Sequence, residues 1–239
     1  MAVLVPFHQD QRLPDDALPL RASAILPSLP EGAFWERVAA LHDGVATETW
    51  LRIREGERPA LVSGDCLVAL AVLRGARQAG HDPGLVWFDA HGDVHTLASS
   101  TSGYVGGMAL RFALGAGPLA LDPPLAEERV TLVDARDLDP AEAEYLSTAA
   151  IRRVPVTEVG PPDEPVVLHV DLDVIDGAEL PGLWYPAPDG PSRAEVVAAV
   201  RRVLDSGQVV ALHIACPWEP GQDEENRSRL LAELTQSTG

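Results

Sequence analysis

The chain is poor in cysteine, in long apolar runs and in positive charge, and each shortage excludes a class of protein. Two cysteines, Cys66 and Cys216, among 239 residues are too few for a disulfide framework. No apolar run approaches the roughly 20 residues that a membrane-spanning helix needs. The first ten residues lack the basic start and the cleavage site of a secretory signal. We therefore expect a cytoplasmic protein with no membrane partner.

Acidic residues outnumber basic ones by 36 to 18, and the net charge is −18 at pH 7. A surface with this charge repels phosphate polyanions, which argues against a nucleic-acid partner. The same charge attracts a cationic small molecule. It also keeps a protein soluble, so that the charge alone does not identify a ligand.

Short apolar strands alternate with helical patterns along the chain. The expected strands are residues 1–5, 59–63, 84–88, 130–133, 165–170 and 208–215, and the expected helices are residues 34–54, 66–80, 104–114, 140–146, 192–204 and 223–235. Continuous apolar strands between helices are typical of a parallel sheet that is covered on both faces. We expect an α/β fold in which residues 1–239 form a single domain, since this length suffices for a substantial core.

Carboxylates gather where two of these strands end. Residues 87–93 read Trp-Phe-Asp-Ala-His-Gly-Asp, and residues 169–176 read His-Val-Asp-Leu-Asp-Val-Ile-Asp. Alternate side chains of an extended chain point the same way. The side chains that we expect to share a face are Asp89, His91 and Asp93 in the first motif, and Asp171 and Asp173 in the second. His169 is interpreted as a structural residue.

Four carboxylates and an imidazole at this density repel one another unless a cation lies among them. Oxygen and nitrogen ligands favour a hard or borderline divalent metal, above all Mn²⁺. Four carboxylates exceed what one ion needs, which favours two bridged ions. Further polar residues follow other expected strands. They lie at the carboxyl ends of those strands, which is where parallel sheets bind their ligands. An aspartate after a strand is more often a turn residue or a helix cap, and only the number of these coincidences favours a site.

These motifs resemble the ureohydrolase (arginase/agmatinase) family. Asp-Ala-His-Gly-Asp at residues 89–93 matches its first motif, Asp171 and Asp173 match its second, and Arg-Asp-Leu-Asp-Pro at residues 136–140 matches a third. Residues 102–107, Ser-Gly-Tyr-Val-Gly-Gly, approach a fourth. The resemblance implies a three-layer α/β/α sandwich around a parallel sheet. It also implies a hydrolase of a guanidine or formimino C–N bond that uses two Mn²⁺ ions.

The resemblance also assigns metal ligands. Asp89 and Asp171 would bridge the two ions, with Asp93 and Cys66 completing one set of ligands and His91 and Asp173 the other. Asp93 and His91 are the expected catalytic residues. Two further carboxylates, Asp65 and Asp176, are expected to lie behind the metal ligands and to hold them in position without binding the metal.

The expected substrate is a small guanidino compound. An α-carboxylate would bind Ser102 and His95, and an α-ammonium group would bind among the acidic residues of the third motif. The expected substrate-binding residues are His95, Ser102, Asp137, Asp139, Glu142 and Tyr185. Homo-oligomers are common in the family, but nothing in this sequence specifies one.

The chain departs from the family pattern at several positions, among them His95 in place of an asparagine and Tyr185 near the place of a threonine, and three further departures bear on the chemistry. A ligand histidine is replaced by Cys66, the family's proton-handling histidine falls on Gly106, and the guanidinium-binding glutamate falls on Ile214. The first two of these three departures are most similar to the branch that hydrolyses Nω-hydroxy-L-arginine to hydroxyurea and ornithine. The alternatives left open are agmatine, arginine, a formimino or amide bond, and a non-catalytic metal-binding protein. Glu219 or His213 could replace the glutamate, although His213 should point to the other face of its strand.

Overall fold

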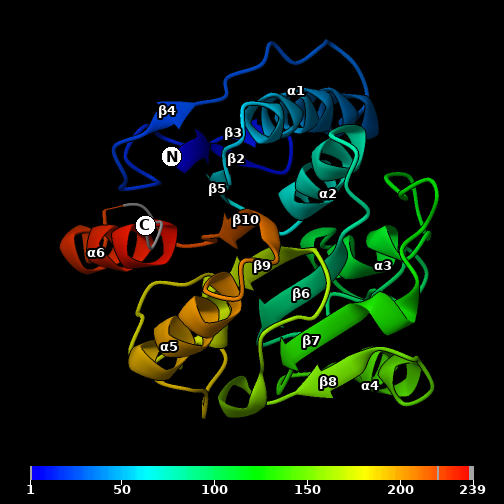
Figure 1. The fold of residues 1–239 in the computed structure, drawn as a ribbon, viewed down its shortest axis with the longest axis vertical. Helices are drawn as coiled ribbons and strands as arrows, with labels where there is room; N and C mark the ends of the chain where they lie inside the picture. The colour runs from blue at the N-terminus through cyan, green and yellow to red at the C-terminus, as the bar shows by residue number, and fades with distance from the viewer. Residues whose placement is uncertain (1, 220, 237–239) are drawn as a thin grey trace.

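The fold is built on one sheet of eight parallel strands in the order β4-β1-β5-β10-β9-β6-β7-β8 (Figure 1). The computed structural model describes residues 2–219 and 221–236, so that Met1, which the sequence places in the first strand, lies outside the described residues. The strands are β1 (Ala2–Val5), β4 (Ser23–Ala24), β5 (Ala60–Ser63), β6 (Gly84–Asp89), β7 (Val130–Asp134), β8 (Arg152–Val154), β9 (Val166–Asp171) and β10 (Val209–Ala215). A separate antiparallel pair joins β2 (Phe7–His8) to β3 (Gln11–Arg12).

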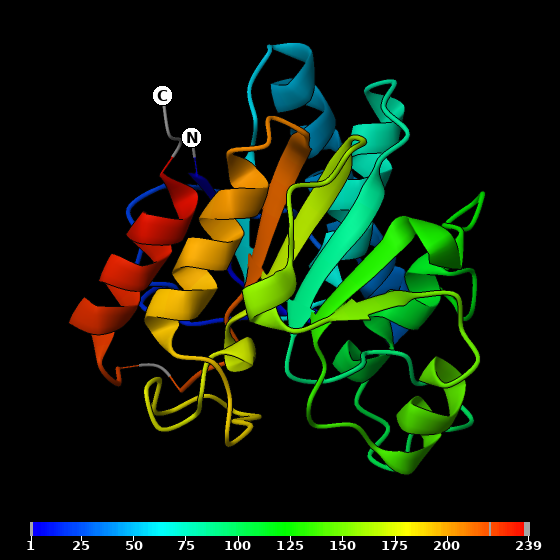
Figure 2. The same ribbon diagram turned by 60° about the horizontal axis from the view of Figure 1, so that its bottom comes forward.

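Helices cover both faces of the sheet and form the outer two layers (Figures 1 and 2). On one face, α1 (Phe34–Arg54), α2 (Val68–Gln78) and α3 (Ala109–Ala113) contribute to one apolar cluster. On the other face, α5 (Arg193–Leu204) and α6 (Glu224–Thr235) contribute to a second cluster. The expected α/β/α sandwich around a parallel sheet is confirmed. No helix in residues 2–219 and 221–236 is long and apolar enough to span a membrane.

Short-range signals explain where two of the helices begin. At α4 (Pro140–Leu146), Asp139 and Glu142 form a reciprocal capping box, and Pro140 occupies the first turn. At α5, the Ser192 hydroxyl accepts a hydrogen bond from the Glu195 backbone N–H. Both helices begin where the sequence predicts.

Two predicted helices are shorter than expected. The segment predicted as helix 66–80 is helical only in α2, because the Asp65 carboxylate accepts the Leu67 N–H at 2.8 Å and holds Cys66 in a turn before the helix. The segment predicted as helix 104–114 contains a 3-10 turn, η1 (Gly106–Met108), followed by α3. Two adjacent glycines, Gly106 and Gly107, disfavour a regular helix there.

The close packing of α1 against α2 depends on one glycine. A Cβ at Gly75 would lie 2.5 Å from the Ala46 carbonyl oxygen and 2.6 Å from the Thr49 Cβ. A Cβ at Gly44, on the facing helix, would meet its nearest atom, the Cβ of Pro27, at 3.4 Å. The two glycines therefore differ in the space around them while sharing a helical backbone.

Gly75→Ala should lower the free energy of unfolding by about 1–2 kcal/mol, because overpacking outweighs the gain in helix propensity. Gly44→Ala should raise it by about 0.5 kcal/mol, because only the propensity changes much. Urea unfolding of both variants and the wild type measures this. If Gly75→Ala stabilised the protein as much as Gly44→Ala, the proposed packing of the two helices would be wrong.

Candidate metal centre and active site

The carboxyl ends of the central strands open onto a cavity of about 500 Å³. Every expected metal ligand and every expected substrate-binding residue contributes to its wall. The lining residues are Cys66, Asp89, His91, Asp93, His95, Ser102, Tyr104, Gly106, Gly107, Asp137, Asp139, Glu142, Asp171, Asp173, Tyr185 and Pro217. Segments that are far apart in sequence thus meet at one edge of the sheet, where parallel sheets bind ligands.

One cluster of ligand atoms joins the end of β6 to the turn after β9. His91 Nδ1 lies 3.0 Å from Asp173 Oδ2 and 3.4 Å from Asp89 Oδ1. Backbone donors hold both carboxylates, since Ala90 N–H donates to Asp173 at 3.1 Å and His91 N–H donates to Asp89 at 2.7 Å. One ligand atom from each of these three side chains lies within 4.8 Å of the others.

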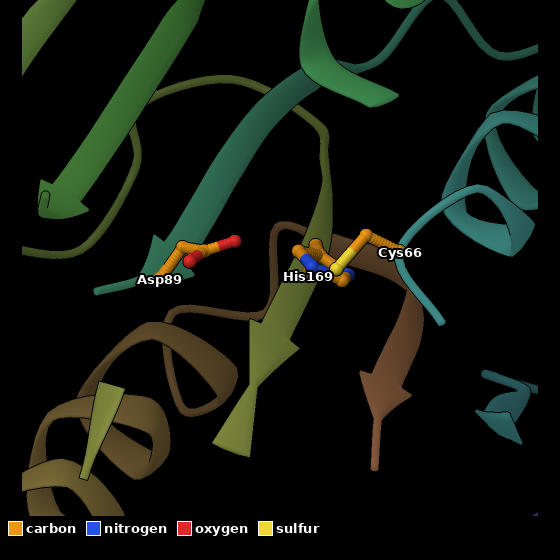
Figure 3. Close-up of side chains that lie close together, drawn as sticks. All are labelled: Cys66, Asp89 and His169. Carbon is orange, nitrogen blue, oxygen red and sulfur yellow. The ribbon is translucent and has the colours of Figure 1, made fainter. Parts of the chain in front are cut away.

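A second cluster lies beside the first and contains Cys66, Asp89 and His169, again with ligand atoms within 4.8 Å of one another (Figure 3). All three side chains are buried. The Cys66 thiol also donates to Asp171 Oδ2 at 2.9 Å. Asp89 therefore belongs to both clusters and lies between them.

Burial and mutual repulsion raise the pKa of the carboxylates in this region. Burial, followed by the charges of neighbouring carboxylates, raises the pKa of Asp93 and of Asp171 well above the usual range. The same causes raise the pKa of Asp89 to about 6, although His91 opposes the shift. Burial lowers the pKa of His91, but hydrogen bonds to Asp173 and Asp89 outweigh it and raise the pKa to about 12.

The residues present fit divalent cations. Asp93 Oδ2 is buried and has no hydrogen-bond partner among the described residues. A buried anion without a partner is costly, and a cation among these groups removes the cost. The donors are carboxylate oxygens, imidazole nitrogens and a thiol, all of which bind divalent transition metals.

The expectation that alternate residues of the two motifs share one face of an extended strand is only partly correct. β6 and β9 end at Asp89 and Asp171, and neither motif continues as a strand. Asp173 lies in a 3-10 turn, η4 (Leu172–Val174), where its N–H donates to Asp171 Oδ1 at 3.0 Å. Asp93 has a left-handed backbone with φ of 53°. These carboxylates reach the cavity through tight turns, which a strand period does not describe.

The rim of the cavity is polar and more exposed than its floor. His95 Nε2 lies 3.0 Å from Asp139 Oδ2, and His95 Nδ1 lies 3.2 Å from Ser99 Oγ. Glu142 is buried below them and accepts the backbone N–H groups of Asp139 at 3.2 Å and Val94 at 3.3 Å. The exposed rim residues are Ser102, Asp137, Asp139 and Tyr185.

Two expected supporting carboxylates do not line the cavity. Asp65 is buried in the turn before α2, where it accepts the N–H groups of Leu67 and Gln9. It therefore fixes the turn that presents Cys66. Asp176 accepts the N–H groups of Ala178 at 2.8 Å and Gly190 at 2.9 Å, and these bonds order the loop after β9.

The departures from the family pattern also have structural explanations. A Cβ on Gly106 would lie 2.4 Å from the Tyr104 Oη, so that the phenol occupies the space of a side chain at position 106. Ile214 is buried in the core on the face of α5 and α6, and of the described residues after β10, Pro217 alone lines the cavity. Glu219 is not among the lining residues. In residues 216–219 and 221–236, no carboxylate therefore contributes to this wall.

The interpretation of His169 as structural missed its position near the ligands. Residues two apart on a strand share a face, so His169 points to the same face as Asp171, one step below it. Its ring packs against Trp87 at an angle of 37°, with centroids 3.7 Å apart, and lies in the second cluster. The strand period of two was the signal that could have found it.

Comparisons with known proteins agree with this geometry. The sequence profile of the arginase family matches residues 31–238. The arginase of Bacillus subtilis (strain 168) is 29% identical over 207 residues, covering 77% of this chain and 70% of that enzyme. The N(omega)-hydroxy-L-arginine amidinohydrolase of Streptomyces lavendulae is 30% identical over 194 residues, covering 75% of this chain and 70% of that enzyme.

Solved structures extend the likeness to the whole fold. The crystal structure of arginase from Bacillus subtilis superposes with a TM-score of 0.82 over 99% of this chain and 96% of that chain. Its 24% identity supports the fold alone. The match of the family profile covers most of the sequence, and the chain therefore belongs to the arginase family of metal-dependent hydrolases.

Proposed function

We propose that this protein is a dinuclear manganese-dependent hydrolase of a guanidino C–N bond. The observation that carries the proposal is that Asp89 belongs to both ligand clusters, one with His91 and Asp173 and one with Cys66 and His169. A carboxylate shared by two adjacent ligand sets is what a two-ion site requires. Mn²⁺ suits the predominance of carboxylate oxygens.

The chemistry that two divalent cations supply in such a cluster is the acidification of water to a nucleophile at neutral pH. Asp93 is the residue suited to the proton transfer, because its Oδ2 has no other partner in the described part of the chain. It takes the proton of the attacking water and passes it to the leaving nitrogen. His91 lies against Asp89 and Asp173 and lines the same cavity, where it would contact the reacting end of the substrate.

The rim suits the amino-acid end of the substrate. Ser102 offers a hydroxyl for an α-carboxylate, and His95 can join it by exchanging its contact with Ser99 or Asp139 for the substrate. Asp137, Asp139 and Glu142 offer acceptors for an α-ammonium group. The buried ligand clusters form the floor and these residues the mouth. This order fits an amino acid that carries its guanidine at the far end of the side chain.

The reacting end favours a hydroxyguanidine over a guanidine. The wall at Pro217 has no carboxylate to pair with a guanidinium cation, a bond worth about 1.5–3 kcal/mol. Tyr104 fills the space at Gly106, so that no imidazole at that position can protonate the leaving group. A hydroxyguanidine is less basic than a guanidine and depends less on both groups. The likeness to the Streptomyces lavendulae amidinohydrolase supports the same choice.

With Mn²⁺ present, kcat/KM should be higher for Nω-hydroxy-L-arginine than for L-arginine, and agmatine should be hydrolysed little because it lacks the carboxylate. Release of hydroxyurea or urea measures all three. Ser102→Ala is the control, because it should lower kcat/KM for the amino acids and leave the rate with agmatine unchanged. A preference for agmatine would remove the carboxylate site, and a preference for arginine would remove the argument from Gly106. Metal binding without turnover of any guanidine would favour a non-catalytic protein.

Asp89→Asn and Asp171→Asn should each reduce the Mn²⁺ content below two ions per chain and abolish turnover, because each removes an anionic ligand between the cations. Elemental analysis after dialysis measures the content. Thermal unfolding with and without Mn²⁺ gives an independent reading, since an ion at 100 times its Kd stabilises the fold by about 2.7 kcal/mol. Asp176→Asn, which removes a carboxylate outside the cavity, should keep the full content. Wild-type stoichiometry in both ligand variants would contradict the two-ion site.

A further inference from the structure

Beneath the ligand clusters, a row of buried polar side chains crosses adjacent strands. Ser63 Oγ lies 2.8 Å from His213 Nε2, and His213 Nδ1 lies 2.8 Å from His169 Nδ1. Ser63 and both histidines are fully buried. β10 pairs with β9 so that the two histidines are neighbours, and β6 places Trp87 on the other side of His169. The row therefore runs toward the metal centre and ends at His169.

The hydrogen bonds of this row fix the tautomer of each imidazole. The Ser63 hydroxyl donates to the Asp65 carbonyl oxygen at 2.9 Å, so that it must accept from His213 Nε2–H. A neutral His213 then presents a lone pair at Nδ1, and the proton shared with His169 must come from His169 Nδ1–H. A neutral His169 consequently carries its free lone pair on Nε2.

That lone pair accepts no hydrogen bond from the described residues. His169 is 0% exposed, and its Nε2 has no hydrogen-bond partner in residues 2–219 and 221–236. A buried polar atom without a partner costs about 1–3 kcal/mol. The imidazole lies within reach of the Cys66 sulfur and of an Asp89 carboxylate oxygen (Figure 3).

A purely structural role does not account for this arrangement. The tilted packing on Trp87, with centroids 3.7 Å apart, needs only an aromatic ring and no nitrogen. Trp87 in turn donates its Nε1–H to Asp89 Oδ2 at 3.0 Å, which connects this ring pair to the shared carboxylate. The ring is thus oriented by His213 and by Trp87, and Nε2, the nitrogen without a hydrogen-bond partner among the described residues, is an atom that binds metals.

We propose that His169 is a ligand, through Nε2, of the ion held by Cys66 and Asp89, an inference that rests on the two-ion site proposed above. Thiolate, imidazole and carboxylate together are softer donors than the oxygen-rich set around Asp173. This half of the centre therefore prefers a borderline ion of the Zn²⁺, Fe²⁺ or Co²⁺ class over Mn²⁺. His213 and Ser63 orient the ligand and set its tautomer.

Titration with Co²⁺ alone, without substrate, tests the ligand through cobalt absorption and sulfur-to-cobalt charge transfer. His169→Phe keeps a ring on Trp87 and should lower affinity at the Cys66 site by more than about 100-fold, beyond the 10–100-fold typical of a partner behind a ligand. His213→Phe is the matched control, since it also breaks the histidine pair but keeps His169 Nε2. It should lower affinity by about 10–100-fold. Equal affinity in His169→Phe and the wild type, or a larger loss in His213→Phe, would overturn the proposal.

A second measurement uses proteins that keep His169, so that its result does not depend on the correct folding of His169→Phe. Proton NMR of the Co²⁺-loaded chain should show a paramagnetically shifted imidazole N–H that exchanges slowly with water, because His169 Nδ1–H is buried against His213. The signal should persist in His91→Asn, whose lost imidazole is partly exposed in the cavity. Its absence from the wild type, or its loss in His91→Asn, would refute the ligand.

These readouts separate the two proposals. A chain that binds Co²⁺ through His169 but hydrolyses no guanidine would disprove the proposed function and leave the ligand intact. A chain that hydrolyses Nω-hydroxy-L-arginine with an unchanged Co²⁺ site in His169→Phe would do the reverse. Competition between Zn²⁺ and Mn²⁺ completes the test, because tighter Mn²⁺ binding at the Cys66 site would contradict the preference for a borderline ion.

Discussion

Repulsion among buried carboxylates is the constraint on which this site depends. Asp89, Asp93, Asp171 and Asp173 are all at most 5% exposed and lie where two central strands end. Without a cation, burial and the charges of neighbouring carboxylates raise the pKa of Asp93 and of Asp171 well above the usual range. The fold therefore stores an electrostatic cost at the cavity floor, and cation binding removes it. Structure and metal binding are coupled by this one cost.

The backbone around the cluster is held by groups that do not themselves bind metal. Arg136 follows β7, pairs with Asp134, and donates to the carbonyl oxygens of Val174 at 3.0 Å and Ala187 at 2.9 Å. A guanidinium can donate to several carbonyls at fixed angles, which suits it to clamping a loop. The turn that carries Asp173, after β9, is thereby tied to the segment after β7, across the intervening β6. The ligands can be crowded together because the segments behind them are rigidly connected.

The sequence predicted the layers of the fold and the strand ends well, because apolar runs and helix caps such as Ser192 are local signals. It was less accurate where geometry depends on non-local contacts or on tight turns. The left-handed backbone of Asp93 and the 3-10 turn at Asp173 are not visible in a strand period. Tyr104 lies over Gly106 while its ring packs near His8 and Tyr185, and Ile214 is buried in the core, so that both positions depend on contacts between distant segments. His169 is different, because the strand period of two is enough to predict that its side chain points to the same face as that of Asp171.

Two of the departures from the arginase pattern share one physical theme, in which a different side chain lies where the family's group is missing. Where the pattern has an imidazole at position 66, the chain has a thiol, and the imidazole of His169 lies within 4.8 Å of it. Where the pattern has a side chain at position 106, the chain has glycine, and the Tyr104 phenol occupies that space. The guanidinium-binding carboxylate has no such replacement, since Pro217 provides the cavity wall after β10. A site that keeps metal-binding and volume-filling groups, but has no carboxylate where the family pattern places the partner of a guanidinium, fits the proposed function, in which the substrate differs and the activation of water does not. That asymmetry is the reason why we propose that the difference in specificity lies in the charge of the substrate's reacting group.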